Sequence, residues 1–194
     1  GSEMCIRDSC ITLNETTYID IYDVSTPQNA KKIKSLSQSG IYKTSRFTNG
    51  YLYTFSAHLI MGECKNEKEI SEYIPSVNGK TMKENKIQKI VDDPVNSYVV
   101  MTSVNLAKPD DFSDTAAVLS DYTTYYMSTS HLYLANTIYE QFLWSNSTKT
   151  AISKFEYKDG AFSYQTTKKV KGQINDSYYM HCLLYTSPSP RDRT

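Results

Sequence analysis

The feature that most constrains this sequence is a set of four short strand patterns, joined by turns, within residues 123–172. The first two, at residues 125–128 and 132–135, are separated by Ser130-His131. That connection is too short for a crossover helix, so the pair is predicted to be antiparallel. Two further alternating patterns, at 151–157 and 162–167, flank Asp159-Gly160, a hairpin signal because both residues tolerate a positive φ. Residues 123–172 therefore predict a four-stranded meander.

Parts of the same pattern occur earlier in the chain. Residues 45–53 align with residues 126–134 at an offset of 81. The third-strand pattern occurs at residues 18–24, 98–104 and 151–157, and an insertion of about residues 61–96 accounts for most of the difference between the two spacings. A repeated four-stranded meander is typical of the blades of a β-propeller. An antiparallel sandwich with coincidental strand resemblance is the alternative.

The predicted fold class is all-β: a partial β-propeller with about two complete four-stranded antiparallel blades and flanking partial blades. We expect the end of one blade at residues 11–40, a blade with the insertion 61–96 at 41–121, a complete blade at 122–172, and the start of the next at 173–181. Within the insertion, residues 65–74 have the apolar spacing of a short helix, Asn78-Gly79 is a turn signal, and residues 92–94 are expected to form a loop.

The two ends of the chain, residues 1–10 and 182–194, are interpreted as artefactual or disordered. Residues 4–9 and 183–194 resemble peptides produced when sequencing-adaptor sequence is translated at the ends of assembled fragments. Pro188 and Pro190 lie among Ser and Arg residues, which favours disorder. Both ends are excluded from the fold prediction, and we expect the natural protein to extend beyond them.

The first coherent strand, residues 17–24, carries apolar side chains on both faces, which indicates that both faces are covered. The next strand, residues 31–37, has outward lysines and is expected to be an exposed outermost strand protected from edge pairing. Residues 175–180 are expected to form the first strand of a further blade.

Several motifs also occur in an order that resembles a known family. They are YDVSTP at residues 22–27, SGIYKTSR at 39–46, EYIP at 72–75, YMS at 126–128, LYLA at 132–135 and TAISKF at 150–155. They resemble the bacterial and archaeal secreted proteins that carry a C-terminal β-propeller domain, over residues 17 to about 179. The resemblance implies an extracellular or cell-surface location, usually behind a signal peptide or a membrane anchor. It implies no assigned activity and no catalytic residues.

Composition and motifs narrow the functional classes. With 21 basic and 21 acidic residues, the chain lacks the basic excess typical of nucleic-acid binding. It has no apolar run of 18 or more residues, so no membrane span is predicted. His58, His131 and His181 have no partner at metal-ligand spacing, and no G-x-S-x-G or phosphate-binding glycine loop occurs. We therefore predict no catalytic residues and no cofactor.

One acidic cluster is a weak metal candidate. Asp110, Asp111 and Asp114 place three carboxylates within five residues, and Ca²⁺ prefers oxygen ligands. The spacing does not match an EF-hand loop, so solvated loop acids are the preferred interpretation. Cys64 is the one cysteine away from the suspect ends, and it predicts no disulfide framework.

Three functional hypotheses remain open. The leading one is a noncatalytic, surface-displayed module that binds a protein or a glycan, with tyrosines such as Tyr42, Tyr122 or Tyr139 as anchors. The alternative is an extracellular hydrolase or lyase whose site, at the mouth of the propeller channel, lies outside this fragment. The third is a structural spacer. Two blades leave apolar faces uncovered, so we expect this chain alone to aggregate or to be molten.

Overall fold

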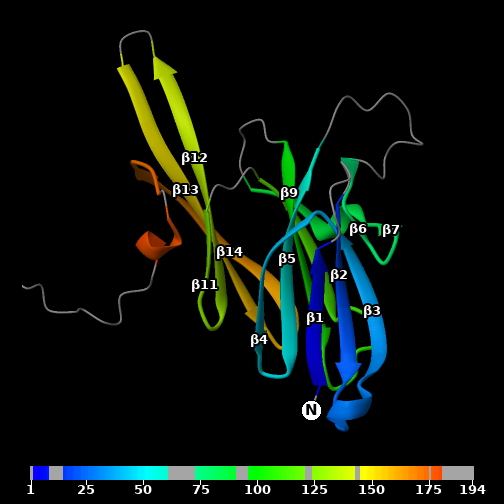
Figure 1. The fold of residues 1–194 in the computed structure, drawn as a ribbon. Helices are drawn as coiled ribbons and strands as arrows, with labels where there is room; N and C mark the ends of the chain where they lie inside the picture. Colours follow the sequence, from blue (N-terminus) through cyan, green and yellow to red (C-terminus); the bar gives the residue numbers. More distant parts are fainter. Residues whose placement is uncertain are drawn as a thin grey trace, which may run out of the picture.

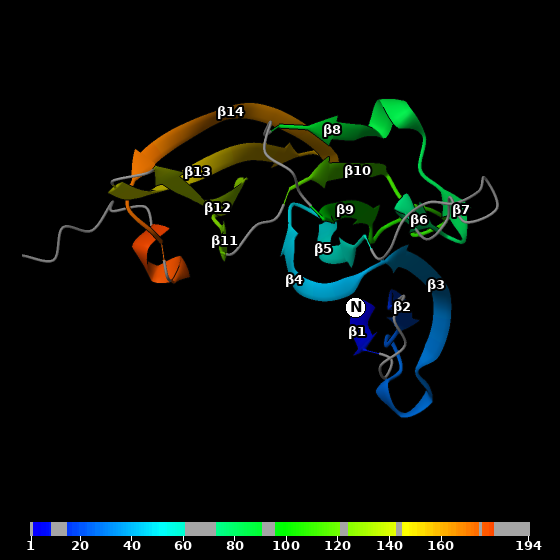
Figure 2. The same cartoon turned by 90° about the horizontal axis from the view of Figure 1, so that it is seen from above.

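The computed structural model describes residues 2–8, 15–60, 73–90, 96–120, 124–142, 145–174 and 176–180. These residues form three sheets, and residues 76–81 return to the first sheet after the second has begun (Figure 1). Seen from above, the sheets fan out, with the second sheet between the other two (Figure 2). The described chain is built from strands and short 3₁₀ turns, so the all-β prediction is confirmed.

The first sheet has the strand order β1-β2-β3-β6-β7. Its strands are β1 (Ser2–Asp8), β2 (Thr16–Asp23), β3 (Lys31–Ser39), β6 (Ser76–Val77) and β7 (Lys80–Thr81), and the 3₁₀ turn η1 (Pro27–Asn29) joins β2 to β3. Neighbouring strands in this sheet are antiparallel.

The second sheet has the strand order β4-β5-β9-β10-β8. Its strands are β4 (Ile41–Thr48), β5 (Tyr51–Leu59), β9 (Ser97–Asn105), β10 (Asp114–Leu119) and β8 (Ile87–Lys89), and the 3₁₀ turn η3 (Glu84–Lys86) precedes β8. The first four form an antiparallel meander, and β8 joins its outer edge parallel to β10.

The third sheet is the four-stranded meander predicted from residues 123–172. Its order is β11-β12-β13-β14, with each neighbouring pair antiparallel. The strands are β11 (Thr124–Met127), β12 (His131–Phe142), β13 (Ser145–Lys158) and β14 (Ala161–Lys171). Two four-stranded meanders and a partial third confirm the predicted partial propeller architecture.

The predicted turns owe their shape to left-handed backbone. Asn78 and Gly79 have φ of 48° and 70°, and Asp159 and Gly160 have φ of 50° and 80°. Asn, Asp and Gly adopt these angles more readily than other residues because of their short or absent side chains. Both hairpins are confirmed.

Most of the core lies in the two joints between sheets, and a smaller cluster of Met82, Val100 and Ala117 packs the insertion against the second sheet. Ile19, Ile21 and Leu36 of the first sheet pack against Leu52 and Val104 of the second. On its other face, the second sheet packs against the third through a larger cluster. That cluster comprises Tyr53, Phe55, Val99, Met101, Val118, Leu132, Leu134, Phe155 and Tyr157. The second sheet is therefore apolar on both faces, as expected for a sheet covered on both sides.

The repeat offset of 81 is wrong by one residue. It aligns Tyr53 with Leu134, yet these side chains meet in the same joint from opposite sheets, so they occupy opposite faces of equivalent strands. An offset of 80 aligns Tyr53 with Tyr133 and Arg46 with Tyr126, and Arg46–Tyr53 and Tyr126–Tyr133 are both cross-strand pairs. A slip of one residue exchanges the faces of a strand, and apolar residues on both faces hid that slip.

Three other expectations differ from the structure. Ser2–Asp8, expected to be part of an artefactual or disordered end at residues 1–10, form β1 along the backbone edge of β2, with Ile6 opposite Ile19. Ser177–Met180 form the 3₁₀ turn η4 where a strand was expected. The outermost strand β3 is partly covered, because Gln38 pairs with Val77 of β6. Each difference depends on which backbone edge is free for pairing, which local pattern does not reveal. The expected helix at residues 65–74 and the loop at 92–94 fall largely or wholly outside the described residues.

Candidate functional site

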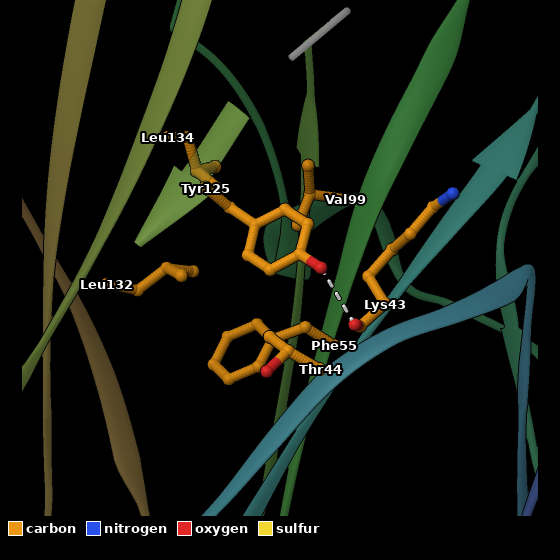
Figure 3. Close-up of a pocket in the computed structure, with 7 residues that line it drawn as sticks. All are labelled: Lys43, Thr44, Phe55, Val99, Tyr125, Leu132 and Leu134. Atoms are coloured by element: carbon orange, nitrogen blue, oxygen red, sulfur yellow. Dashed lines mark hydrogen bonds between the residues drawn. The ribbon is translucent and has the colours of Figure 1, made fainter. Parts of the chain in front are cut away.

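A small hollow lies in the joint between the second and third sheets (Figure 3). Its volume is about 10 Å³, roughly the room that a single water molecule needs. The Tyr125 hydroxyl spans it and donates a hydrogen bond of 2.9 Å to the Lys43 carbonyl oxygen (Figure 3). Apolar side chains, among them Phe55 and Leu132, form the remaining wall. This hollow belongs to sheet packing.

The same joint is fastened by the tip of the β13–β14 hairpin. The Gly160 amide donates to the Tyr53 hydroxyl at 2.9 Å, and Ser103 Oγ donates to the Gly160 carbonyl. Two residues on, the Phe162 amide donates to Asp114 Oδ2 at 3.0 Å. These contacts satisfy the backbone of a buried turn, which would otherwise be costly, so their role is structural.

A buried polar network fastens the other joint. Gln38, 1% exposed, donates from Nε2 to Ser56 Oγ at 2.7 Å and accepts from Thr102 Oγ1. Ser56 Oγ in turn donates to the Ser39 carbonyl at 2.7 Å. Because its members satisfy one another, this network holds the first and second sheets together and offers no group to a ligand.

The insertion lines two hollows together with β3 and the β9–β10 connection. Its β6–β7 hairpin extends the first sheet and its β8 extends the second, so it connects their outer edges (Figure 2). Between the hairpin and the β9–β10 connection lie two adjoining hollows of about 320 and 400 Å³, which share Asn78, Lys80 and Asp111. We call them together the insertion groove. It is lined by Lys34, Ser35, Leu36, Ser37, Val77, Asn78, Lys80, Thr81, Met82, Lys83, Lys86, Asp110, Asp111, Phe112 and Thr115.

Asn78 organises the middle of the insertion groove. Its Oδ1 accepts from the Ser37 amide at 3.0 Å, and its own amide donates to the Ser37 carbonyl at 2.8 Å. Its Nδ2 donates to Asp111 Oδ1 at 2.8 Å, across to the β9–β10 connection. The left-handed conformation of Asn78 thus lets one side chain join β3, the hairpin and the opposite wall.

The groove carries an excess of positive charge. Its lining includes Lys34, Lys80, Lys83 and Lys86 against Asp110 and Asp111. Lys86 Nζ is held by Asp114 Oδ1 at 2.7 Å, an ion pair with exposed fractions of 45% and 19%. The remaining lysines line open hollows, where anionic groups of a ligand are favoured.

The three calcium candidates do not converge. Asp110 is exposed and lies 4.0 Å from Lys108. Asp111 accepts from Asn78 and from the Phe112 amide, whereas Asp114 accepts from Lys86, the Thr115 amide and the Phe162 amide. Among the residues that the structure describes, no group of three or more His, Cys, Asp or Glu side chains could hold a metal ion.

The other residues considered in the sequence also lie apart. Tyr139 is 68% exposed on the third sheet, whereas Tyr42 is half-buried with its hydroxyl 3.0 Å from Ser45 Oγ. His58 is buried at 4% exposure. Burial lowers the pKa of His131, with Lys154 acting in the same direction. Tyr122, His181 and Cys64 lie outside the described residues.

Sequence reasoning missed the insertion groove. The lysine-rich stretch at residues 80–89 was its available signal, but nothing local indicated that this stretch would face β3 and the β9–β10 connection. The acidic cluster in the sequence pointed to Asp110 and Asp111 as metal candidates, and both residues line the groove.

Successive four-stranded antiparallel sheets, packed face to face and fanning out, define a propeller-type repeat protein. The family model described as "Beta propeller domain" matches residues 4–183, and the chain therefore belongs to that family. A search of the curated proteins finds no match. Within the described residues, none of the helical segments has the length and apolar character needed to cross a membrane.

Proposed function

We propose that this chain is a noncatalytic propeller module, secreted or displayed on the cell surface, that binds a protein or a glycan in the insertion groove. The observation that carries the proposal is the groove itself. Side chains from β3, the insertion and the β9–β10 connection converge on an open hollow with several lysines in its walls, which borders the first joint at Leu36 and Phe112. Loops on a rigid sheet scaffold are common places for binding sites.

The extracellular location rests on the resemblance in ordered motifs to secreted propeller proteins. It predicts that protease added outside intact cells of the source organism removes the native protein, while a cytoplasmic marker survives. Protection equal to that of the marker would contradict the location without bearing on the groove.

Binding is tested by screening the purified chain against immobilised glycans and extracellular protein segments. Thr81 is exposed on β7 and lines the groove, so Thr81→Trp is expected to fill it and weaken a groove ligand at least about tenfold. The matched control is Thr166→Trp on exposed β14, which is expected to leave affinity unchanged. A ligand that binds both variants equally would contradict the proposal.

The same screen separates binding from turnover. If a bound glycan is cleaved by the purified chain, the hydrolase or lyase alternative is favoured over the noncatalytic module. Product analysis by mass spectrometry after prolonged incubation provides that measurement.

A further inference from the structure

The outer edge of β3 is open over most of its length. β6 pairs with β3 only where Gln38 faces Val77, and next to that pair Asn78 occupies both backbone groups of Ser37. Within the described part of the chain, no strand lies beside the rest of this edge. The edge is visible as the outer rim of the first sheet, below the β6–β7 hairpin (Figure 1).

The backbone of Ser35 faces the same side as that of Ser37. In an antiparallel ladder, a residue's N–H and C=O point to one side, and the residue two positions away points to that side too. Ser35 is exposed and Ile33 is 49% exposed. The edge beyond Ser37 therefore presents backbone donors and acceptors to solvent.

The 400 Å³ part of the insertion groove lies directly along this edge. One of its walls is the consecutive stretch Lys34 to Ser37 of β3, and the facing walls are Asn78 with Lys80 and Asp110 with Asp111. A hollow that runs beside a free strand edge has the shape required by an added extended strand.

The lysines beside this edge determine which kind of extended strand can pair with it. Lys31, Lys32 and Lys34 belong to β3, and Lys80 stands across the groove. Lysines along an edge discourage pairing with the chain's own basic strand or with neutral strands. Opposite charges on cross-strand neighbours are instead stabilising, so an acidic strand is attracted by the same lysines that repel others.

The nearby aspartates do not neutralise the lysines that favour an acidic strand, because these aspartates already have other partners. Asp111 already accepts hydrogen bonds from Asn78 and the Phe112 amide, and Asp110 faces Lys108. On the other face of the first sheet, Asp20 is occupied by Ser35 Oγ at 2.6 Å and by Lys32 Nζ at 3.5 Å. Lys34 and Lys80 remain the cations that line the 400 Å³ hollow beside this edge.

We propose that the outer edge of β3 accepts an extended acidic peptide segment of a partner protein as an added β-strand, lying in the insertion groove. The added strand lies beside β3 next to β6, where β6 no longer pairs with β3, and its backbone pairs with that of Ser35. Its acidic side chains contact Lys34 and Lys80. This inference rests on the proposed binding function and narrows its ligand from protein or glycan to a strand-forming acidic peptide.

The test uses the full chain and a fluorescein-labelled peptide of eight residues that alternates Glu and Val, with binding measured by fluorescence anisotropy at low salt. A Lys–Val peptide of the same length is expected to bind at least about tenfold more weakly. The Glu–Val peptide with every backbone nitrogen methylated keeps its charge but cannot donate to β3, and is expected to lose binding.

Protein variants locate the site. Lys34→Glu combined with Lys80→Glu is expected to weaken Glu–Val binding at least about tenfold. The matched control is Lys169→Glu combined with Lys171→Glu on exposed β14, which is expected to keep more of the affinity. Far-ultraviolet circular dichroism confirms that each variant retains the wild-type sheet content.

Three results would overturn this inference: equal binding of the methylated peptide, equal loss in both charge-reversal variants, or no binding of the Glu–Val peptide. In the last case, a glycan or a folded protein that binds wild-type chain but not Thr81→Trp leaves the proposed function standing. If no ligand distinguishes Thr81→Trp from Thr166→Trp, the proposed function fails as well.

Discussion

Two turn glycines have almost the same backbone conformation in different surroundings. Gly50 has φ of 81° after Asn49, and Gly160 has φ of 80° after Asp159. A Cβ at Gly50 would meet no atom within 4 Å, whereas a Cβ at Gly160 would lie 2.5 Å from Cε1 of Tyr51. The first glycine is needed for its backbone angle alone, and the second also for the close approach of two sheets.

Gly160→Ala is therefore expected to destabilise the protein more than Gly50→Ala. The left-handed angle costs either alanine about 1 kcal/mol, and at residue 160 the clash adds about 1–2 kcal/mol more. Urea denaturation of both variants at low protein concentration measures the difference. An equal decrease in the free energy of unfolding for both variants would show that the β13–β14 turn does not pack closely against Tyr51.

A buried phenol predicts how stability depends on alkaline pH. Tyr157 is 2% exposed and its hydroxyl donates to the Ser128 carbonyl. Burial raises the pKa of Tyr157 from 10.0 to about 12. The pKa of Tyr157 is higher in the folded than in the unfolded chain. The stability contributed by its buried, protonated hydroxyl is therefore complete below pH 10 and is lost as pH rises toward 12.

Tyr157→Phe is expected to flatten the decline of unfolding free energy between pH 10 and 12, at a cost of about 1 kcal/mol at neutral pH from the lost hydrogen bond. Urea denaturation at a series of pH values gives the curve. Tyr139→Phe, at a side chain 68% exposed, is the control and should leave the curve as it is. An unchanged slope in Tyr157→Phe would contradict the assignment.

At the scale of elements, the insertion adds strands to the outer edges of two different sheets. The β6–β7 hairpin belongs to the first sheet and β8 to the second. Asn78 connects this hairpin to β3, through Ser37, and to the β9–β10 connection, through Asp111. Asn78 therefore helps to set the width of the groove, together with the Lys86–Asp114 ion pair.

Asn78→Gly keeps the turn conformation available but removes the side-chain hydrogen bonds. We expect the amides of Ser37 and Val77 to exchange with deuterium at least about tenfold faster, as the hairpin opens locally by roughly 1–2 kcal/mol. Amides of β13 serve as the internal control. Unchanged exchange at Ser37 would show that the hairpin is held by other contacts.

At the scale of the whole molecule, the first and third sheets each have a face that does not meet the second. Tyr18 of β2 is 42% exposed and Val170 of β14 is 42% exposed. On the outward face of the third sheet, Tyr126 and Tyr133 stand with ring centroids 6.2 Å apart. In a propeller, a neighbouring blade covers such a face.

The purified chain is therefore expected to self-associate as concentration rises. The buried clusters in both joints favour association of folded chains over a molten state. Light scattering coupled to size exclusion, with circular dichroism on the same samples, measures both properties. Tyr133→Lys combined with Val170→Lys should reduce the association. A monomer at every concentration, with a sharp thermal transition, would contradict this expectation.

Much of the fold follows from local sequence. The Asp159-Gly160 and Asn78-Gly79 turns were predictable because their residues tolerate positive φ. The four strands of the third sheet were predictable from alternation and turn spacing. Of the candidate site, the sequence indicated Asp110 and Asp111, but as candidate metal ligands and not as residues that line a groove. Lys34, the hairpin at Asn78 and Lys80, and Asp111 come together from distant parts of the chain, and no local sequence pattern indicates this.

The sequence by itself determined where strands begin and turn, because side-chain size and backbone preference act over a few residues. Only the tertiary structure decided which faces meet and which edges pair. It placed Tyr53 and Tyr133 at equivalent positions of their two sheets, paired β8 parallel to β10, and added β1 to β2. These choices depend on contacts between residues far apart in the chain, and several pairings are compatible with the same alternating pattern. Long-range packing selects among them.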